Sequence, residues 1–245
     1  MSLPTPFRLL RTGPGAPAWN MALDEALLEA YTPDAPPILR LYSWEPAGFS
    51  LGRFQSAGEL EPPPGAVVVR RLSGGAAIHH REDEVTYALV APYALFGGLD
   101  PRAAYGAIHG AIEAGLAGLG VGARDRSEGG ARASRRGLCY ATPTDYDLVV
   151  EGRKLVGSAQ RRQGRCFLQH GSIPLSPDPR VPEASSLREL LGRDVERAEV
   201  EGALLEGFTS LASSWIHDAV RDVERAQADA LVRSRYGCAS WTEAK

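Results

Sequence analysis

One cysteine of the chain has neighbours that would make its thiol reactive. Cys139 stands in the segment GLCY and directly follows a basic stretch, residues 124–136, that contains five arginines. Nearby cations lower the pKa of a thiol from about 8.5 and so favour the thiolate, which is the nucleophile in acyl transfer. A buried, inert cysteine is the more common alternative. Because Cys166 lies in a predicted strand and Cys238 in a polar tail, we predict that Cys139 is the working cysteine.

A lysine just past a predicted hairpin turn is the second candidate. Lys154 precedes a run of small residues, which leaves room for a ligand against the strand. A lysine ammonium can polarise a carbonyl group or neutralise a phosphate. A surface lysine beside a hairpin, with His170 as a hydrogen-bonded core residue, is the alternative, and spacing alone leaves both open. The candidate binding residues here are Gly157, Ser158, Ala159, Gln160, His170 and Gly171.

The third candidate is the stretch RRLSGGAAIHH, residues 70–80. A predicted strand ends there in two arginines and enters a turn whose glycines let the backbone approach a ligand. Exposed backbone N–H groups and arginine suit a phosphate or carbonyl oxygen. Taken alone, a Gly-Gly turn after a strand favours the simpler interpretation of a tight turn. The candidate binding residues are Arg71, Ser73, Gly74, Gly75, Ala76 and His80.

The composition is that of a globular chain. Of its 245 residues 44% are hydrophobic and 23% are charged, and the net charge of −3 argues against a generally basic nucleic-acid binder. The sequence has no signal-peptide pattern and no apolar run that approaches a membrane span. Neither a CxxC nor an HExxH motif supports a metal site. We therefore expect a cytoplasmic protein with free thiols that binds no nucleic acid, membrane or metal.

Hydrophobic spacing predicts the elements that position these residues. Predicted strands dominate residues 1–175 and predicted helices residues 184–235, which favours a single α+β domain over 1–245. The stretch 124–136 is expected to be an exposed basic loop. Strand 48–54 is expected to pair with strand 38–44. The other predictions are strands at 7–11, 66–72, 85–91 and 165–175, a hairpin at 146–162 that turns at Glu151-Gly152, and helices at 18–31 and 102–119.

Four segments together resemble the family of lipoate and octanoate transferases and ligases, which shares its catalytic fold with biotin protein ligases. They occur in order over most of the chain, so the resemblance is specific although each segment alone is weak. It implies an α+β fold with mixed, mostly antiparallel sheets flanked by helices and a helical C-terminal part. The segments are NMALDEALL (20–28), LRLYSWEPAGFSLGRFQ (39–55), RRLSGG (70–75) with His80, and EGRKLVGSAQRR to LQHGS (151–172).

Within that family the chain resembles the cysteine-dependent octanoyltransferases more than the ligases. Ligases usually have a Gly-Asn pair where this chain has Asp83 and Glu84, and acidic residues there would repel a triphosphate unless they held magnesium. The transferases have a (S/G)-x-Cys-(F/Y) segment that corresponds to the one around Cys139. Ala76 and Arg81 depart from the family's third glycine and from the aspartate after its histidine.

The resemblance implies a two-step acyl transfer without ATP or another cofactor. Cys139 would take the octanoyl group from an octanoyl-acyl carrier protein as a thioester, and Lys154 would orient the acyl carbonyl. A lysine on a lipoyl domain or glycine cleavage H protein would then accept the group as an amide. Ala76, Ala77 and Ala159 would line the tunnel for the acyl chain. The basic loop 124–136 suits docking of an acidic carrier, and a solvated insertion is the alternative.

Two other functions stay open at this point. The same fold is found in ATP-dependent lipoate-protein ligases, in which Cys139 would be incidental. The departures at Ala76 and Arg81 also fit a non-catalytic subunit that binds an acyl group or a carrier protein. For all three functions we expect a monomer.

Overall fold

The computed structural model describes residues 5–125 and 147–244. The strands are β1 (Thr5–Gly15), β2 (Ile38–Trp44), β3 (Gly48–Leu51), β4 (Val67–Arg70), β5 (Ile78–His80), β6 (Glu84–Pro92), β7 (Arg124–Asp125), β8 (Asp147–Val150), β9 (Arg153–Gln163), β10 (Cys166–Pro174) and β11 (Ala212–Asp218). The α-helices are α1 (Pro17–Ala30), α2 (Pro101–Gly118), α3 (Leu187–Leu191), α4 (Arg197–Gly207), α5 (Asp222–Leu231) and α6 (Ala239–Thr242). Short helical turns are η1 (Ala57–Glu59), η2 (Tyr93–Phe96), η4 (Phe208–Ser210) and η5 (Val232–Tyr236).

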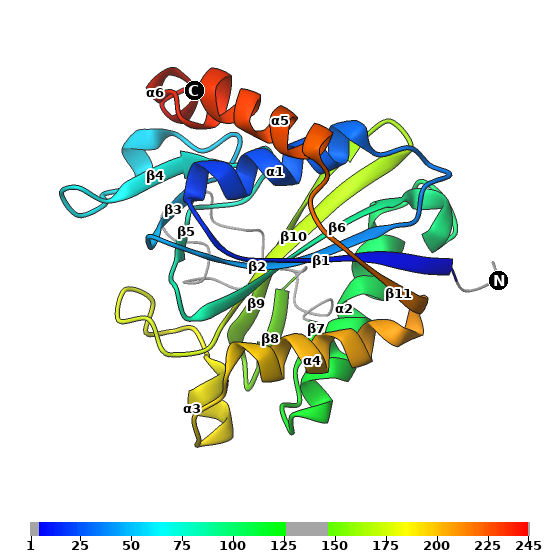
Figure 1. The fold of residues 1–245 in the computed structure, drawn as a ribbon. Helices are drawn as coiled ribbons and strands as arrows, with labels where there is room; N and C mark the ends of the chain where they lie inside the picture. Colours follow the sequence, from blue (N-terminus) through cyan, green and yellow to red (C-terminus); the bar gives the residue numbers. More distant parts are fainter. Residues whose placement is uncertain (1–4, 126–146, 245) are drawn as a thin grey trace.

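Two sheets organise the described residues. The larger has the strand order β11-β1-β2-β6-β10-β9-β8-β7, and only the β11-β1-β2 pairings in it are parallel. The smaller has the order β4-β3-β5 and lies beside α1 (Figure 1). The predicted α+β class with mixed, mostly antiparallel sheets is confirmed.

Helices cover both faces of the large sheet. Helices α1 and α5 pack on one face, and α2 and α4 pack on the other (Figure 1). Strand β2 shows how the sequence provides for both: Leu39 and Leu41 join the core with α2 and α4, whereas Ile38 and Tyr42 join the core with α1 and α5. Because strand side chains alternate between faces, a sheet covered on both sides needs a nearly continuous apolar run.

The structure corrects the predicted partner of residues 48–54. Strand β3 pairs with β4 and β5 in the small sheet, not with β2. The reason is that β2 has no free edge, because β1 and β6 occupy its two sides. Strand β5 was not predicted, since three residues are too few to show an alternating pattern.

The C-terminal part contains a strand where the sequence predicts only helix. Residues 212–218 form β11, which pairs in parallel with β1 at the edge of the large sheet. Trp215 and Ile216 suit an extended chain, and pairing with β1 outweighs the helical spacing of the preceding segment. Part of the predicted loop 124–136 is also ordered, because Arg124–Asp125 form β7, and residues 126–136 lie outside the described residues.

None of the helices that the structure describes is long and apolar enough to cross a membrane.

Two glycines allow α2 and α4 to pack closely. A Cβ atom on Gly207 would lie 2.0 Å from the backbone oxygen of Ala111 and 2.6 Å from the nitrogen of Gly115. A Cβ on Gly115 would lie 2.5 Å from the oxygen of Ala203. Both are contacts with backbone, which cannot rotate away as a side chain can. The two helices can therefore lie this close only because neither glycine has a side chain.

Gly207→Ala is expected to destabilise the fold by about 1–3 kcal/mol, because overpacking forces the two helices apart. Gly202→Ala is the matched control, since Gly202 is on the same helix and a Cβ there meets nothing within 4 Å. That control should raise the free energy of unfolding by about 0.5–1 kcal/mol through helix propensity. Urea unfolding measures both, and equal effects of the two variants would contradict this account of the packing.

Candidate active site

A cavity with a volume of ≈ 410 Å³ lies between α1, the small sheet and strands β9 and β10. Its wall contains residues from both of the predicted binding stretches, which are about 80 positions apart in the sequence. The lining residues are Met21, Tyr42, Trp44, Ser50, Arg71, Gly74, Gly75, Ile78, His80, Thr86, Gly157, Ser158, Ala159, His170, Gly171 and Ser172.

Close contacts between backbone segments shape two sides of this cavity. On the side of β9 and β10, a Cβ on Gly171 would lie 2.7 Å from Gly157 O, Ser158 Oγ and Tyr87 Cε1. On the side of the small sheet, a Cβ on Gly52 would lie 1.8 Å from the backbone oxygen of Gly75. Gly75 has a φ of 92°, which favours glycine. The glycines therefore bring backbone, rather than side chains, to the cavity wall.

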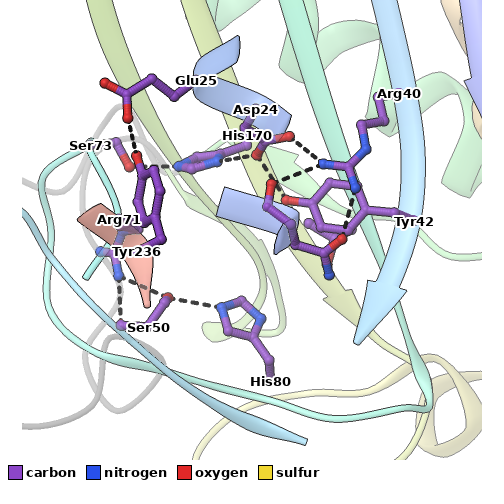
Figure 2. A network of polar contacts seen from close by, with 12 residues as sticks. Asp24, Glu25, Arg40, Tyr42, Ser50, Arg71, Ser73, His80, His170 and Tyr236 are labelled. Carbon is purple, nitrogen blue, oxygen red and sulfur yellow. Dashed lines mark hydrogen bonds and ion pairs between the residues drawn. The ribbon is translucent and has the colours of Figure 1, made fainter. Parts of the chain in front are cut away.

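A buried polar chain supports one side of the cavity (Figure 2). Arg40 Nη1 donates to Asp24 Oδ1 over 2.6 Å, and both side chains are fully buried. Tyr42 Oη also donates to Asp24, over 2.9 Å. His170 Nδ1 lies 2.9 Å from Asp24 Oδ2, and its Nε2 lies 2.6 Å from Ser73 Oγ. This chain connects α1, β2, β10 and the Gly-Gly turn.

A second polar chain also contributes to the cavity wall (Figure 2). Arg71 Nη1 lies 3.2 Å from Ser50 Oγ, which lies 2.9 Å from His80 Nε2. His80 Nδ1 lies 2.8 Å from Glu84 Oε1, and the His80 ring stacks on Trp44 with a centroid distance of 3.7 Å. Arg71 also donates to the backbone oxygens of Ser50, Gly74 and Ala76, so it holds the turn in shape.

The buried acids of these chains are ionised. Burial by itself would raise the pKa of Asp24, but the charge of Arg40 and the hydrogen bond with His170 outweigh it and lower that pKa. Burial opposes ionisation of Glu84 in the same way, and His80 and Thr86 lower its pKa on balance. Burial lowers the pKa of His80 despite Glu84. Neutral His80 therefore donates from Nδ1 to Glu84 and accepts from Ser50 at Nε2.

Lys154 is a fully buried lysine, so its interpretation as a surface residue is wrong. Its Nζ lies 2.8 Å from Asp147 Oδ1, and Asp147 is buried as well. The two residues lie on the neighbouring strands β8 and β9. Lys154 precedes Gly157 of the cavity wall by three positions on β9. The ion pair with Asp147 stabilises the buried ammonium group. Because little water surrounds it, its electrostatic interaction with other charges nearby is strong.

The structure does not bring every predicted residue to the cavity. Gln160 accepts from Tyr93 Oη and donates to Gln169, so its side chain bonds to η2 and β10. Ser73 and Ala76 stand behind the wall, where Ser73 contacts His170 and the oxygen of Ala76 binds Arg71. The position of Cys139 lies outside the described residues.

Sequence reasoning missed several polar residues of the site. Asp24, Ser50 and Asp147 complete the buried networks, and Trp44 covers His80. A carboxylate on the apolar face of helix 18–31 was a signal for Asp24. Glu84 was noted only as a residue that opposes a triphosphate, whereas the structure shows it bonded to His80 and Thr86. Among the described residues no three His, Cys, Asp or Glu side chains are arranged to hold a metal ion.

Comparison with known proteins agrees with this geometry. A family model described as the lipoyl protein ligase A/B catalytic domain matches residues 16–183, which include the whole cavity wall. The chain belongs to this family.

Relatives in the lipoyl protein ligase A/B family are similar over almost the full length. The octanoyltransferase LipM of Kyrpidia tusciae is 37% identical over 98% of this chain and 99% of the relative. The octanoyltransferase LipM of Moorella thermoacetica is 36% identical over 96% of this chain and 97% of the relative. These similarities support octanoyl transfer in lipoate biosynthesis, an acyltransferase activity, for this member of the family.

Solved structures show the same fold. A lipoate-protein ligase A bound with ATP has a TM-score of 0.84 and 23% identity, covering 98% of this chain and 99% of that one. A bipartite lipoate protein ligase from Thermoplasma acidophilum has a TM-score of 0.80 and 22% identity, covering 98% and 96%. At this level of identity the similarity establishes the fold and not the reaction.

Replacement of Asp24 by asparagine tests the first buried chain. The variant leaves Arg40 buried without a countercharge, so the free energy of unfolding at pH 7 should fall by about 3–5 kcal/mol. The native pKa of Asp24 lies below its unfolded value near 3.8, so its contribution is present above pH 3.8 and lost as the pH falls through the native pKa. The difference between wild type and variant should therefore shrink in acid.

Urea unfolding of both proteins between pH 7 and the acid range measures this difference. Asp34→Asn is the control, because Asp34 is an exposed acid in a loop and its replacement should change little. A constant difference between Asp24→Asn and wild type at all pH values would mean that the Asp24 charge contributes nothing.

Proposed function

We propose that this protein moves an octanoyl group from an octanoyl-acyl carrier protein to a lysine of a lipoyl domain or glycine cleavage H protein, through a thioester on Cys139. The observation that carries the proposal is the similarity to curated octanoyltransferases over nearly the whole chain. The cavity supports it, because a site with an apolar wall and a few fixed polar groups suits an acyl chain with one carbonyl.

The first step exchanges one thioester for another. The Cys139 thiolate attacks the acyl carbonyl carbon, a C–S bond forms to the enzyme, and the C–S bond to the carrier breaks. The carrier leaves as a thiol after it takes up a proton. Because the thioester keeps its acyl-transfer potential, the reaction needs no ATP and no other cofactor.

The described residues suit the acyl group in two ways. Met21, Trp44 and Ile78 give the wall apolar surface, and each buried CH₂ of the chain contributes about 0.8 kcal/mol. Lys154, held by Asp147, supplies a positive charge beside β9, which would stabilise the negative charge that develops on the carbonyl oxygen. Backbone N–H groups at Gly75 and Gly157 are further candidates for that role.

Charge favours the carrier-protein substrates as well. Acyl carrier proteins and lipoyl domains are commonly acidic, and residues 124–136 contain five arginines. The buried Glu84 also argues against a ligase, because its carboxylate is committed to His80 and Thr86 and adds negative charge where a triphosphate would bind.

Intact-protein mass after mixing with octanoyl-acyl carrier protein, without ATP, tests the proposal. We expect an octanoyl adduct that hydroxylamine removes, and we expect no adduct on Cys139→Ala. Cys238→Ala is the matched control, since this half-exposed cysteine lies in the C-terminal segment and should leave the adduct unchanged.

Other results would point to a different function. An adduct on Cys139→Ala would exclude the proposed nucleophile. No adduct from the carrier protein or from an octanoylated H protein, together with ATP-dependent attachment of free lipoate, would identify a ligase. Binding of the acyl carrier protein without either reaction would identify a non-catalytic subunit.

A further inference from the structure

A second cavity, with a volume of ≈ 340 Å³, adjoins the first. Ser172 belongs to the walls of both cavities, and Glu84 of the second cavity is bonded to His80 and Thr86 of the first. Ile78 of the first cavity also packs against Val181 and Ala184 of the second. The lining residues of this second cavity are His79, Arg81, Glu84, Ser172, Pro174, Asp178, Val181 and Ala184.

A histidine–aspartate pair faces this second cavity. His79 Nδ1 lies 2.7 Å from Asp178 Oδ2, and the two side chains are 14% and 9% exposed. Phe49 stacks on the His79 ring with a centroid distance of 4.6 Å, so the ring has a fixed orientation. The hydrogen bond from His79 and that from the backbone of Arg180 lower the pKa of Asp178 against the effect of burial. An ionised Asp178 accepts a hydrogen bond from Nδ1–H of His79, which leaves Nε2 as the ring nitrogen that can take a proton.

The wall of the second cavity matches the two parts of a lysine side chain. Pro174, Val181 and Ala184 offer apolar surface to an aliphatic stem. The wall also contains two carboxylates, Glu84 and Asp178, against one guanidinium, Arg81. Arg81 is occupied with the backbone oxygens of Ser176 and Pro177 and with Asp83. The balance of charge therefore favours an ammonium group.

The second cavity also lies close to the place where the acyl carbonyl would be held. The backbone N–H of Ser185, next to Ala184 of its wall, donates to the backbone oxygen of Lys154 over 2.8 Å. Gly157, three residues after Lys154, belongs to the wall of the first cavity. Lys154 is thus bonded through its backbone to the segment beside the second cavity and lies three residues from the wall of the first.

We propose that the second cavity receives the acceptor's lysine side chain and that His79, oriented by Asp178, takes the proton from its ammonium group. The proposal rests on the proposed function, of which it specifies the second step. The first cavity then holds the octanoyl chain, and the two substrates meet at the part of the wall that the cavities share.

The proposed step balances in atoms and charge. The acceptor enters as R–NH₃⁺ and gives one proton to Nε2 of His79. The amine nitrogen forms a bond to the acyl carbon, the C–S bond to Cys139 breaks, and the departing sulfur takes the second proton. The products are the amide, the Cys139 thiol and a protonated His79, which returns its proton to water.

His79→Asn separates this role from a structural one. The asparagine amide can occupy the place of Nδ1 and still donate to Asp178, but it has no basic nitrogen. Pre-formed octanoyl-enzyme is mixed with an apo lipoyl domain, and the loss of the adduct is followed by mass. We expect the transfer to slow by about 100-fold, within the usual range for a lost general base. Formation of the octanoyl-enzyme should be unchanged.

The pH dependence gives a second readout. Asp178, from the loop after β10, hydrogen-bonds His79, and Arg81 after β5 and Glu84 at the start of β6 line the same cavity. Arg180 lies over the Phe49 ring that stacks on His79. A general base must be unprotonated to act, so wild-type transfer should rise with pH. His79→Asn should lose that rise, whereas His217→Asn, at an exposed histidine of β11, should keep it.

The outcomes are distinguishable from those for the proposed function. If wild type forms no octanoyl-enzyme, the proposed function fails. If octanoyl-enzyme forms and His79→Asn transfers it at the wild-type rate, the role of His79 is refuted while the thioester route stands. Equal losses in both steps with an unchanged pH profile would mean that the His79–Asp178 pair only holds the loop in place.

Discussion

The buried ion pair between Asp24 of α1 and Arg40 of β2 fixes the position of the elements around the active site. Two charges lose their hydration there, and such a pair is tolerated only where geometry is good and the remaining hydrogen-bonding groups are satisfied. Arg40 also donates to Asn20 and Thr12, and Asp24 also binds Tyr42 and His170. Any displacement of α1 from the sheet would leave charge unpaired, so one placement is strongly favoured.

With α1 in that position, a cavity remains between the helix, the small sheet and strands β9 and β10. Elsewhere along the large sheet, apolar side chains fill the space under α1, as Leu10 and Val90 do. At Gly157 and Gly171 two wall positions of the sheet have no side chain, and Gly75 brings the small sheet's turn close to Gly52. The glycines therefore allow close backbone approach in the cavity wall, and the buried polar residues hold that wall in position.

Hydrogen bonds and ion pairs also hold the charged groups of the site in fixed positions. Glu84 is ionised but bonded inward to His80 and Thr86, and Lys154 is charged but tied to Asp147. Oriented charges in a dry site need no reorganisation when a reaction changes the charge of the substrate. A member of this family can thus perform acyl transfer with few groups that touch the substrate, while many others hold those few in place.

The sequence by itself determined the α+β class, most of the strands and both cavity-forming stretches, because alternation, helical spacing and glycine-rich turns are local patterns. It also indicated Lys154, whose burial and pairing with Asp147 it did not show. Only the tertiary structure decided that β3 pairs with β4 and not with β2, that residues 212–218 form a strand, and that Asp24 lies beside His170. These features depend on which strand edges are already occupied and on which distant charges must be paired after burial. Such competition is settled only when the whole chain has folded.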